Sequence, residues 1–81
     1  MLILKERVLY EASKLYIEYT QKGDITLYTL DIDTPNNETV NIYAHDSKKT
    51  IDFIFDSIVA ELNNNPNKVV DVNYIIRMAY E

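Results

Sequence analysis

The only histidine of the chain stands beside an aspartate, and this His45-Asp46 pair is the first candidate for chemistry. An imidazole held by a neighbouring carboxylate is the minimum arrangement for a general base near neutral pH. The serines that could serve as its nucleophile are Ser13, Ser47 and Ser57, and their spacing singles out none of them. Asp46 and Ser47 are also good N-cap residues. We therefore interpret His45 as structural or exposed rather than catalytic.

A second candidate is the Asp31-Ile32-Asp33 segment, with Glu38 a few residues further on. Strand alternation places Asp31 and Asp33 on the same side, where a hard cation such as Mg²⁺ or Ca²⁺ could bind. The EF-hand pattern fails because Ile42 occupies the position of its last carboxylate. The alternative is a solvated strand end whose charges discourage edge pairing. The sequence favours this alternative and predicts no metal and no cofactor.

A third candidate is the set of carboxylates Asp52, Asp56 and Glu61 on an expected helix. It is either a solvated outer face or a row of charges that imitates DNA phosphates. In size, acidity and mixed α/β composition the chain resembles the small phage-encoded inhibitors of restriction and CRISPR systems. That resemblance implies an alternative function, in which the chain inhibits a host nucleic-acid-binding enzyme by occupying its basic groove.

Composition argues against several other functions. The chain has no Cys, no Trp and a single Gly, so it lacks glycine-rich phosphate loops, thiolate zinc sites and disulfides. No catalytic motif is present, and we predict a protein that is not an enzyme. The net charge of −5 disfavours binding to nucleic acid or to anionic membranes and favours a protein partner.

The expected location and origin also follow from composition. The first apolar run is too short for a signal peptide, and no stretch reaches the ~20 apolar residues of a membrane span. We expect a cytoplasmic protein, in the host cytoplasm if it is viral. The abundance of Ile, Asn, Lys and Tyr, whose codons are AT-rich, suggests an accessory protein of a virus, phage or mobile element.

The first residues predict an amphipathic helix over 3–21, followed by a stop at Lys22-Gly23. Its apolar positions are Leu4, Val8, Ala12, Leu15 and Tyr19. An alternative remains for Leu15–Gln21. This segment is rich in β-formers and can be one arm of a hairpin that turns at Lys22-Gly23-Asp24.

The rest of the chain predicts two strands, a helix and a third strand. The strands span 25–33 and 39–45, joined by a turn at 34–38. The helix spans about 48–63. Its apolar face consists of Ile51, Ile54, Phe55, Ile58, Val59 and Leu62. Alternation from Val70 to Tyr80 predicts a final strand extending to Glu81, which fits better than a helix over 72–80.

Together these elements predict a single α+β domain over 1–81, in the order α-β-β-α-β. We expect a two-layer sandwich with both helices on one face of a three-stranded antiparallel sheet. In this sheet the strand 25–33 lies between the other two (order 2-1-3).

A second apolar stripe on the first predicted helix suggests the function. Ile3, Tyr10 and Ile17 recur every seven residues on the side away from the expected core. Such a row either packs under a loop or the chain end, or it is a subunit contact that a twofold axis would bury against itself. We therefore predict a small acidic protein-interaction module that forms a homodimer.

Overall fold

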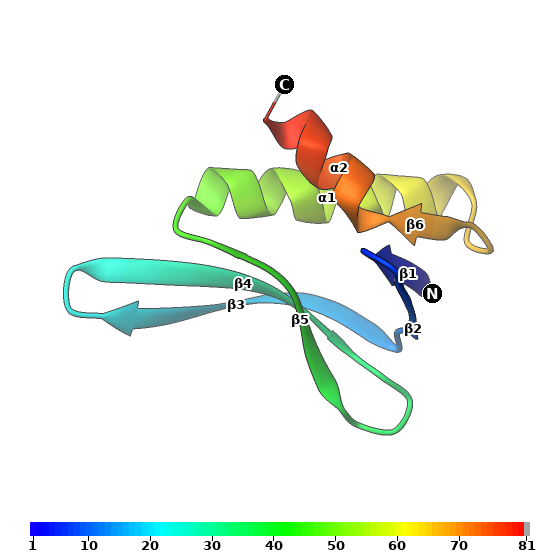
Figure 1. The fold of residues 1–81 in the computed structure, drawn as a ribbon, viewed down its shortest axis with the longest axis horizontal. Coiled ribbons are helices and arrows are strands. Elements are labelled where there is room, and N and C mark those ends of the chain that lie inside the picture. The colour runs from blue at the N-terminus through cyan, green and yellow to red at the C-terminus, as the bar shows by residue number, and fades with distance from the viewer. Residues whose placement is uncertain (81) are drawn as a thin grey trace.

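Two three-stranded sheets and two helices build the fold, and the computed structural model describes residues 1–80 (Figure 1). The elements are β1 (Leu2–Lys5), β2 (Val8–Glu11), β3 (Lys14–Lys22), β4 (Ile25–Asp33), β5 (Thr39–His45), α1 (Lys48–Asn64), β6 (Val69–Asp71) and α2 (Val72–Ala79). One sheet has the order β3-β4-β5 and the other β2-β1-β6. The class α+β is confirmed, but the predicted single sheet and the order α-β-β-α-β are wrong. Glu81, placed by the sequence in a final strand, lies outside the described residues.

The second half of the predicted helix 3–21 is a strand. β3 pairs with β4 along its whole length, as far as Lys22 opposite Ile25. The Leu15–Thr20 run is rich in β-branched and aromatic side chains, which favour a strand. Gly23, with φ of +60°, begins the two-residue turn, in a conformation that suits glycine best. The hairpin that the sequence left open for this segment is therefore the arrangement found.

The first half of that predicted helix forms a small hairpin, β1–β2. Its turn contains Glu6 with a φ of 57°, and Ile3 pairs across the hairpin with Tyr10. β1 also pairs in parallel with β6, where Ile3 lies opposite Val70. This pairing buries Ile3 and Val70 to 0% and 1% exposure. The predicted helix would have satisfied its hydrogen bonds locally. It would therefore have lacked the backbone pairing that β1 makes with β6.

The predicted last strand, 70–81, is wrong beyond Asp71. This aspartate ends β6 and caps α2, because its side chain accepts a hydrogen bond from the Tyr74 N–H at 3.2 Å. Val72 and Ile75 are buried, three residues apart, as on one face of a helix. Tyr74 is exposed, although alternation placed it in the core.

The predicted helix 48–63 is present as α1, capped by Ser47, which accepts the Thr50 N–H at 3.3 Å. The strands predicted over 25–33 and 39–45 are β4 and β5. The buried core consists of Ile3, Ala12, Leu30, Ile32, Ile42, Ile51, Ile54, Ile58, Val70, Val72 and Ile75. Both sheets and both helices therefore share one core.

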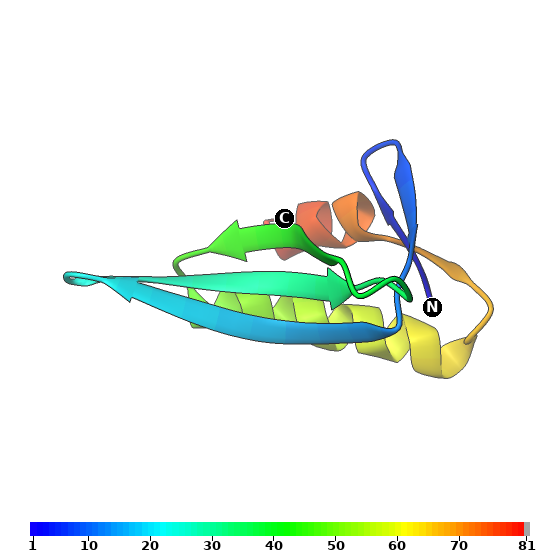
Figure 2. The same cartoon turned by 90° about the horizontal axis from the view of Figure 1, so that it is seen from below.

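The layers are clearest from below the sheet, where β3–β4–β5 lies in front of α1 (Figure 2). The β1–β2 hairpin stands at the end of this sheet far from the Gly23 turn (Figure 2). α2 packs beside α1, and the two helices leave a groove between them. Within residues 1–80, neither helix has the length and apolar character needed to cross a membrane.

Candidate functional site: the interhelical groove

Several large apolar side chains remain exposed among the described residues. They are Met1, Val8, Leu9, Tyr19, Ile25, Leu27, Phe53, Val69, Tyr74, Met78 and Tyr80. Single exposed apolar residues are ordinary, and an informative case is one in which several line the same hollow. Phe53 and Met78 meet this condition.

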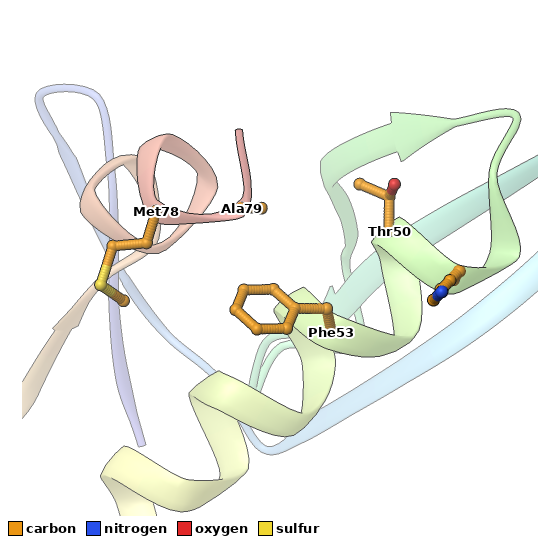
Figure 3. Close-up of a pocket in the computed structure, with 5 residues that line it drawn as sticks. Thr50, Phe53, Met78 and Ala79 are labelled. Atoms are coloured by element: carbon orange, nitrogen blue, oxygen red, sulfur yellow. The ribbon is translucent and has the colours of Figure 1, made fainter. Parts of the chain in front are cut away.

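The interhelical groove is a hollow of about 370 Å³ lined by Lys49, Thr50 and Phe53 of α1 and Met78 and Ala79 of α2. Phe53 points from α1 toward Met78 across the hollow (Figure 3). Phe53 is 47% exposed and Met78 is 38% exposed. Phe53, Met78 and Ala79 therefore make part of the lining apolar, whereas Lys49 adds a positive charge to it.

Helical periodicity explains why Phe53 faces this groove. The buried residues Ile51, Ile54 and Ile58 lie on one face of α1. A step of 100° per residue turns position 53 away from that face, onto the flank beside α2. Phe53 is thus an apolar residue that the core stripe does not include.

A second, smaller hollow lies between the end of α1 and the start of α2. It measures about 100 Å³ and includes Val69 and Tyr74 among its lining residues. Tyr74 is one helical turn before Met78, so the exposed apolar surface continues along α2. Lys68 and Glu61 also line this hollow and form an ion pair at 2.7 Å.

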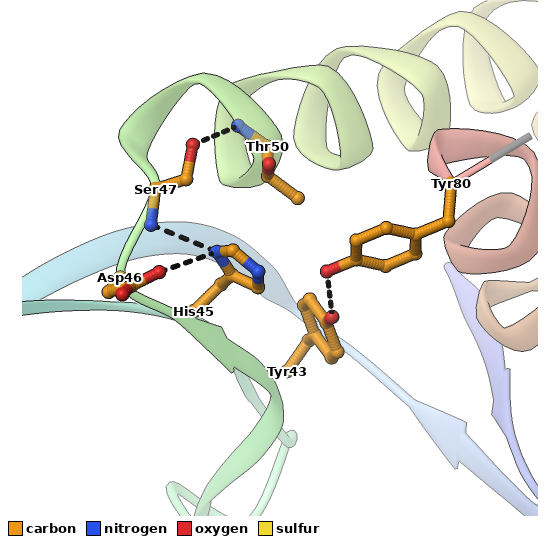
Figure 4. Close-up of polar contacts among 6 residues, drawn as sticks. All are labelled: Tyr43, His45, Asp46, Ser47, Thr50 and Tyr80. Atoms are coloured by element: carbon orange, nitrogen blue, oxygen red, sulfur yellow. Dashed lines mark hydrogen bonds and ion pairs between the residues drawn. The ribbon is translucent and has the colours of Figure 1, made fainter.

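The end of α2 is held to β5 by a pair of tyrosines. The hydroxyl oxygens of Tyr43 and Tyr80 lie 2.6 Å apart (Figure 4). Burial and the hydrogen bond with Tyr80 raise the pKa of Tyr43 to about 12. The His45 ring lies close to both, with centroid distances of 6.2 Å to Tyr43 and 6.0 Å to Tyr80. This contact fixes the wall of the groove that carries Met78 and Ala79.

His45 belongs to the start of α1 rather than to a catalytic pair. Its Nδ1 accepts the Ser47 N–H at 2.9 Å, which requires an unprotonated Nδ1. The Asp46 carboxylate is 3.2 Å from the same nitrogen and could pair only with a protonated one. Ser47 is itself occupied as the cap of α1. The geometry therefore joins His45, Asp46 and Ser47 in a capping structure (Figure 4).

The Asp31 and Asp33 carboxylates are held by neutral donors. Asp31 is 6% exposed and accepts hydrogen bonds from Thr29 at 3.2 Å and Asn41 at 3.0 Å. The Tyr16 hydroxyl donates to Asp33 at 2.8 Å. In residues 1–80, no three His, Cys, Asp or Glu side chains are grouped to hold a metal ion. Asp31 is thus not the simple solvated strand end that the sequence favoured.

The predicted acidic face is divided between two flanks of α1. Asp52 accepts a hydrogen bond from Lys48 at 2.6 Å, and this bond raises the pKa of Lys48. Asp56 is exposed one turn further along. Glu61 lies on the α2 side, in the smaller hollow. The structure therefore does not align these three carboxylates in one row.

The stripe of Ile3, Tyr10 and Ile17 loses its basis, because the helix that aligned these residues is absent. Ile3 and Tyr10 are cross-strand partners in β1–β2, and Ile3 is fully buried. Ile17 lies in β3, in the other sheet, and is half-buried. The structure thus brings two of these residues together, in the core rather than on a free surface.

The groove residues were missed in the sequence for two different reasons. Phe53 gave a usable signal, since it is a large apolar residue outside the predicted apolar face of its helix. Met78 gave no such signal, because the predicted strand 70–81 places it on the apolar face. Only the helical form of α2 turns it toward Phe53.

The chain matched no family model, no curated protein and no solved structure.

Proposed function

We propose that the chain is a small non-catalytic protein-binding module whose interhelical groove receives an apolar side chain of another protein. The observation that carries this proposal is the pairing of Phe53 and Met78 across one hollow while both remain substantially exposed. Covering a large apolar side chain contributes roughly 1.5–3 kcal/mol. A methionine wall adapts its shape to different occupants, as in other protein-binding surfaces.

The rim of the groove indicates the chemistry of the partner. Lys49 stands beside the apolar hollow and favours a carboxylate next to the anchoring side chain. The proposed ligand is therefore a protein segment with a large apolar residue and a neighbouring acidic residue. Apolar anchors in a helical groove with charges at the rim are an established mode of peptide recognition.

A small probe with the same two features tests the proposal. We expect 4-phenylbutyrate to shift the amide NMR signals of Lys49, Phe53 and Met78 in a saturable way. The matched amine, 4-phenylbutylamine, carries the same ring with the opposite charge and should bind more weakly. Shifts spread evenly over the exposed apolar residues, or stronger binding of the amine, would overturn the proposal.

A matched pair of variants tests the site. Met78→Ala should weaken binding of 4-phenylbutyrate about tenfold, because apolar contact area is lost. Leu27→Ala is the control, since Leu27 is 41% exposed against 38% for Met78 but lies on the β3–β4 hairpin. Equal weakening by both variants would contradict a site in the groove.

The acidic-inhibitor function has less structural support and stays a prediction. Two of the three carboxylates that this function needs already form ion pairs within the chain. Asp52 pairs with Lys48, and Glu61 pairs with Lys68. A phosphate-like row needs unpaired charges at regular intervals on one face, whereas Glu61 lies on another flank. Titration against a basic nucleic-acid-binding protein, with Asp56→Lys as the variant, tests it directly.

A further inference from the structure

β3 is an edge strand with one side left open. It is 9 residues long, and among residues 1–80 it pairs with β4 alone. Hydrogen-bonded and non-hydrogen-bonded pairs alternate along an antiparallel ladder, so every second residue of β3 directs its N–H and C=O away from β4. An open edge of this length is a template for another strand.

The two faces of β3 differ in character. Leu15 and Ile17 are half-buried against the core, on the α1 side of the sheet. Lys14, Glu18 and Lys22 alternate with them and are exposed on the opposite face. Among the described residues, neither Lys14 nor Glu18 takes part in an ion pair. Their charges are therefore available to a strand that pairs with β3.

α1 adds apolar surface next to this edge. Phe53 faces α2 on one flank of α1, which turns Phe55 and Val59 toward the other flank. α1 contacts β3, and its ribbon emerges beyond the β3 edge of the sheet (Figure 2). Phe55 and Val59 are only half-buried. A second strand beside β3, carrying its own helix, would cover these side chains together with Leu15 and Ile17.

We infer that a second copy of this chain pairs antiparallel along β3, about a twofold axis at Tyr16. This register sets Lys14 opposite Glu18 of the partner subunit, and Glu18 opposite the partner's Lys14. Leu15 then faces the partner's Ile17 on the apolar side. The β3–β4–β5 sheet of one copy then joins that of the other into one continuous sheet, with both copies of α1 on the same face.

Charge selects this register over its neighbours. An axis at Glu18 would set Glu18 against itself and Lys14 against Lys22, which places like charges directly opposite each other. An axis at Thr20 would pair Glu18 with Lys22, but it would leave Leu15 and Ile17 outside the overlap. The axis at Tyr16 is the one that satisfies both the charges and the apolar pairs.

Charge reversal tests the interface by sedimentation equilibrium over a range of protein concentrations. The unaltered protein should form a dimer. Lys14→Glu and Glu18→Lys should each raise the dimer dissociation constant about tenfold or more, because each creates like-charge pairs at two symmetric positions. The double reversal Lys14→Glu/Glu18→Lys restores both opposite-charge pairs and should recover the dimer.

Two controls keep the result specific. Lys22→Glu lies outside the paired charges and should leave the dissociation constant unchanged, whereas weakening by this variant would overturn the Tyr16 register. Met78→Ala alters the interhelical groove alone and should leave dimerisation intact, so the two proposals fail independently. Circular dichroism of every variant should match the parent. A parent that stays monomeric at high concentration, or a double reversal that stays dissociated, overturns the interface.

Discussion

Phe53 and Phe55 are two residues apart on α1, yet they lie in different surroundings. Phe53 is 47% exposed beside Met78, whereas Phe55 is half-buried against the core on the other flank. Both are apolar residues on the same helix, so hydrophobicity alone does not separate them. The two residues differ because the 100° step of the helix directs them to different flanks and because α2 lies beside only one of these flanks. The comparison shows that α1 supplies the core with its central face and leaves an apolar residue exposed on one flank.

The largest effect should come from the face between these two flanks. Ile54 is fully buried, and Ile54→Ala should reduce the free energy of unfolding by about 2–5 kcal/mol, since it removes apolar contacts and leaves a cavity. Chemical denaturation measures this change. A loss below about 1 kcal/mol would show that α1 does not present this face to the sheet.

The two phenylalanines give the direct comparison. Phe55→Ala should destabilise the protein by about 1–3 kcal/mol, which is less than full core burial would give. Phe53→Ala should cost under about 1 kcal/mol, because Phe53 is already half in water. Denaturation curves of the two variants, recorded together, check the order. The reverse order would exchange the roles of the two flanks.

The N-cap of α1 should stabilise the whole helix, and therefore both of its flanks. Ser47→Ala removes the side-chain acceptor of the Thr50 N–H and should cost about 1 kcal/mol. Ser47→Asp keeps an acceptor at the cap and serves as the matched control, with a loss close to zero. Thermal unfolding measures both. If Ser47→Asp were as damaging as Ser47→Ala, the cap would not be the cause.

The last prediction concerns the tyrosine pair at the end of α2, whose effect is confined to alkaline pH. The pKa of Tyr43 in the folded protein, about 12, lies above its ordinary value of 10.0. The folded state therefore holds this proton more tightly than the unfolded state. Its contribution to stability is present below pH 10 and is lost as the pH rises toward 12.

Tyr80→Phe separates the hydrogen bond from burial. Removal of the Tyr80 hydroxyl should lower the pKa of Tyr43 while leaving it above 10.0, since burial remains. Phenolate absorbance during an alkaline titration measures this shift, with Tyr74→Phe as the control because Tyr74 is exposed on the same helix. An unchanged titration in Tyr80→Phe would show that the hydroxyl pair does not hold Tyr43.

The elements that could be predicted are those with local causes. The face from Ile51 to Leu62 repeats at helical spacing over several turns, and Ser47 caps it, so α1 was visible in the sequence. β4 and β5 were visible because a proline-containing turn separates two runs of β-formers. In these segments periodicity and turn chemistry agree.

The errors lie where pairing partners are distant in the chain. Spacings from Leu4 to Tyr19 resemble a helix, but β1 gains its place from β6 near the other end of the sequence. The last segment changes period within a few residues, from a short strand to a helix that begins at Val72. Alternation carried past that point placed Met78 on the wrong element. The groove depended on this detail and was hidden for the same reason.

The parallel pairing of β1 with β6 also imposes an order on biosynthesis. On the ribosome, β1 and β2 emerge early but cannot complete their sheet until Val69–Asp71 has left the exit tunnel. Until then they form an isolated two-stranded hairpin, which is only marginally stable in water. Ile3 therefore stays uncovered until Val69–Asp71 is available, and completion of this sheet waits for the arrival of β6.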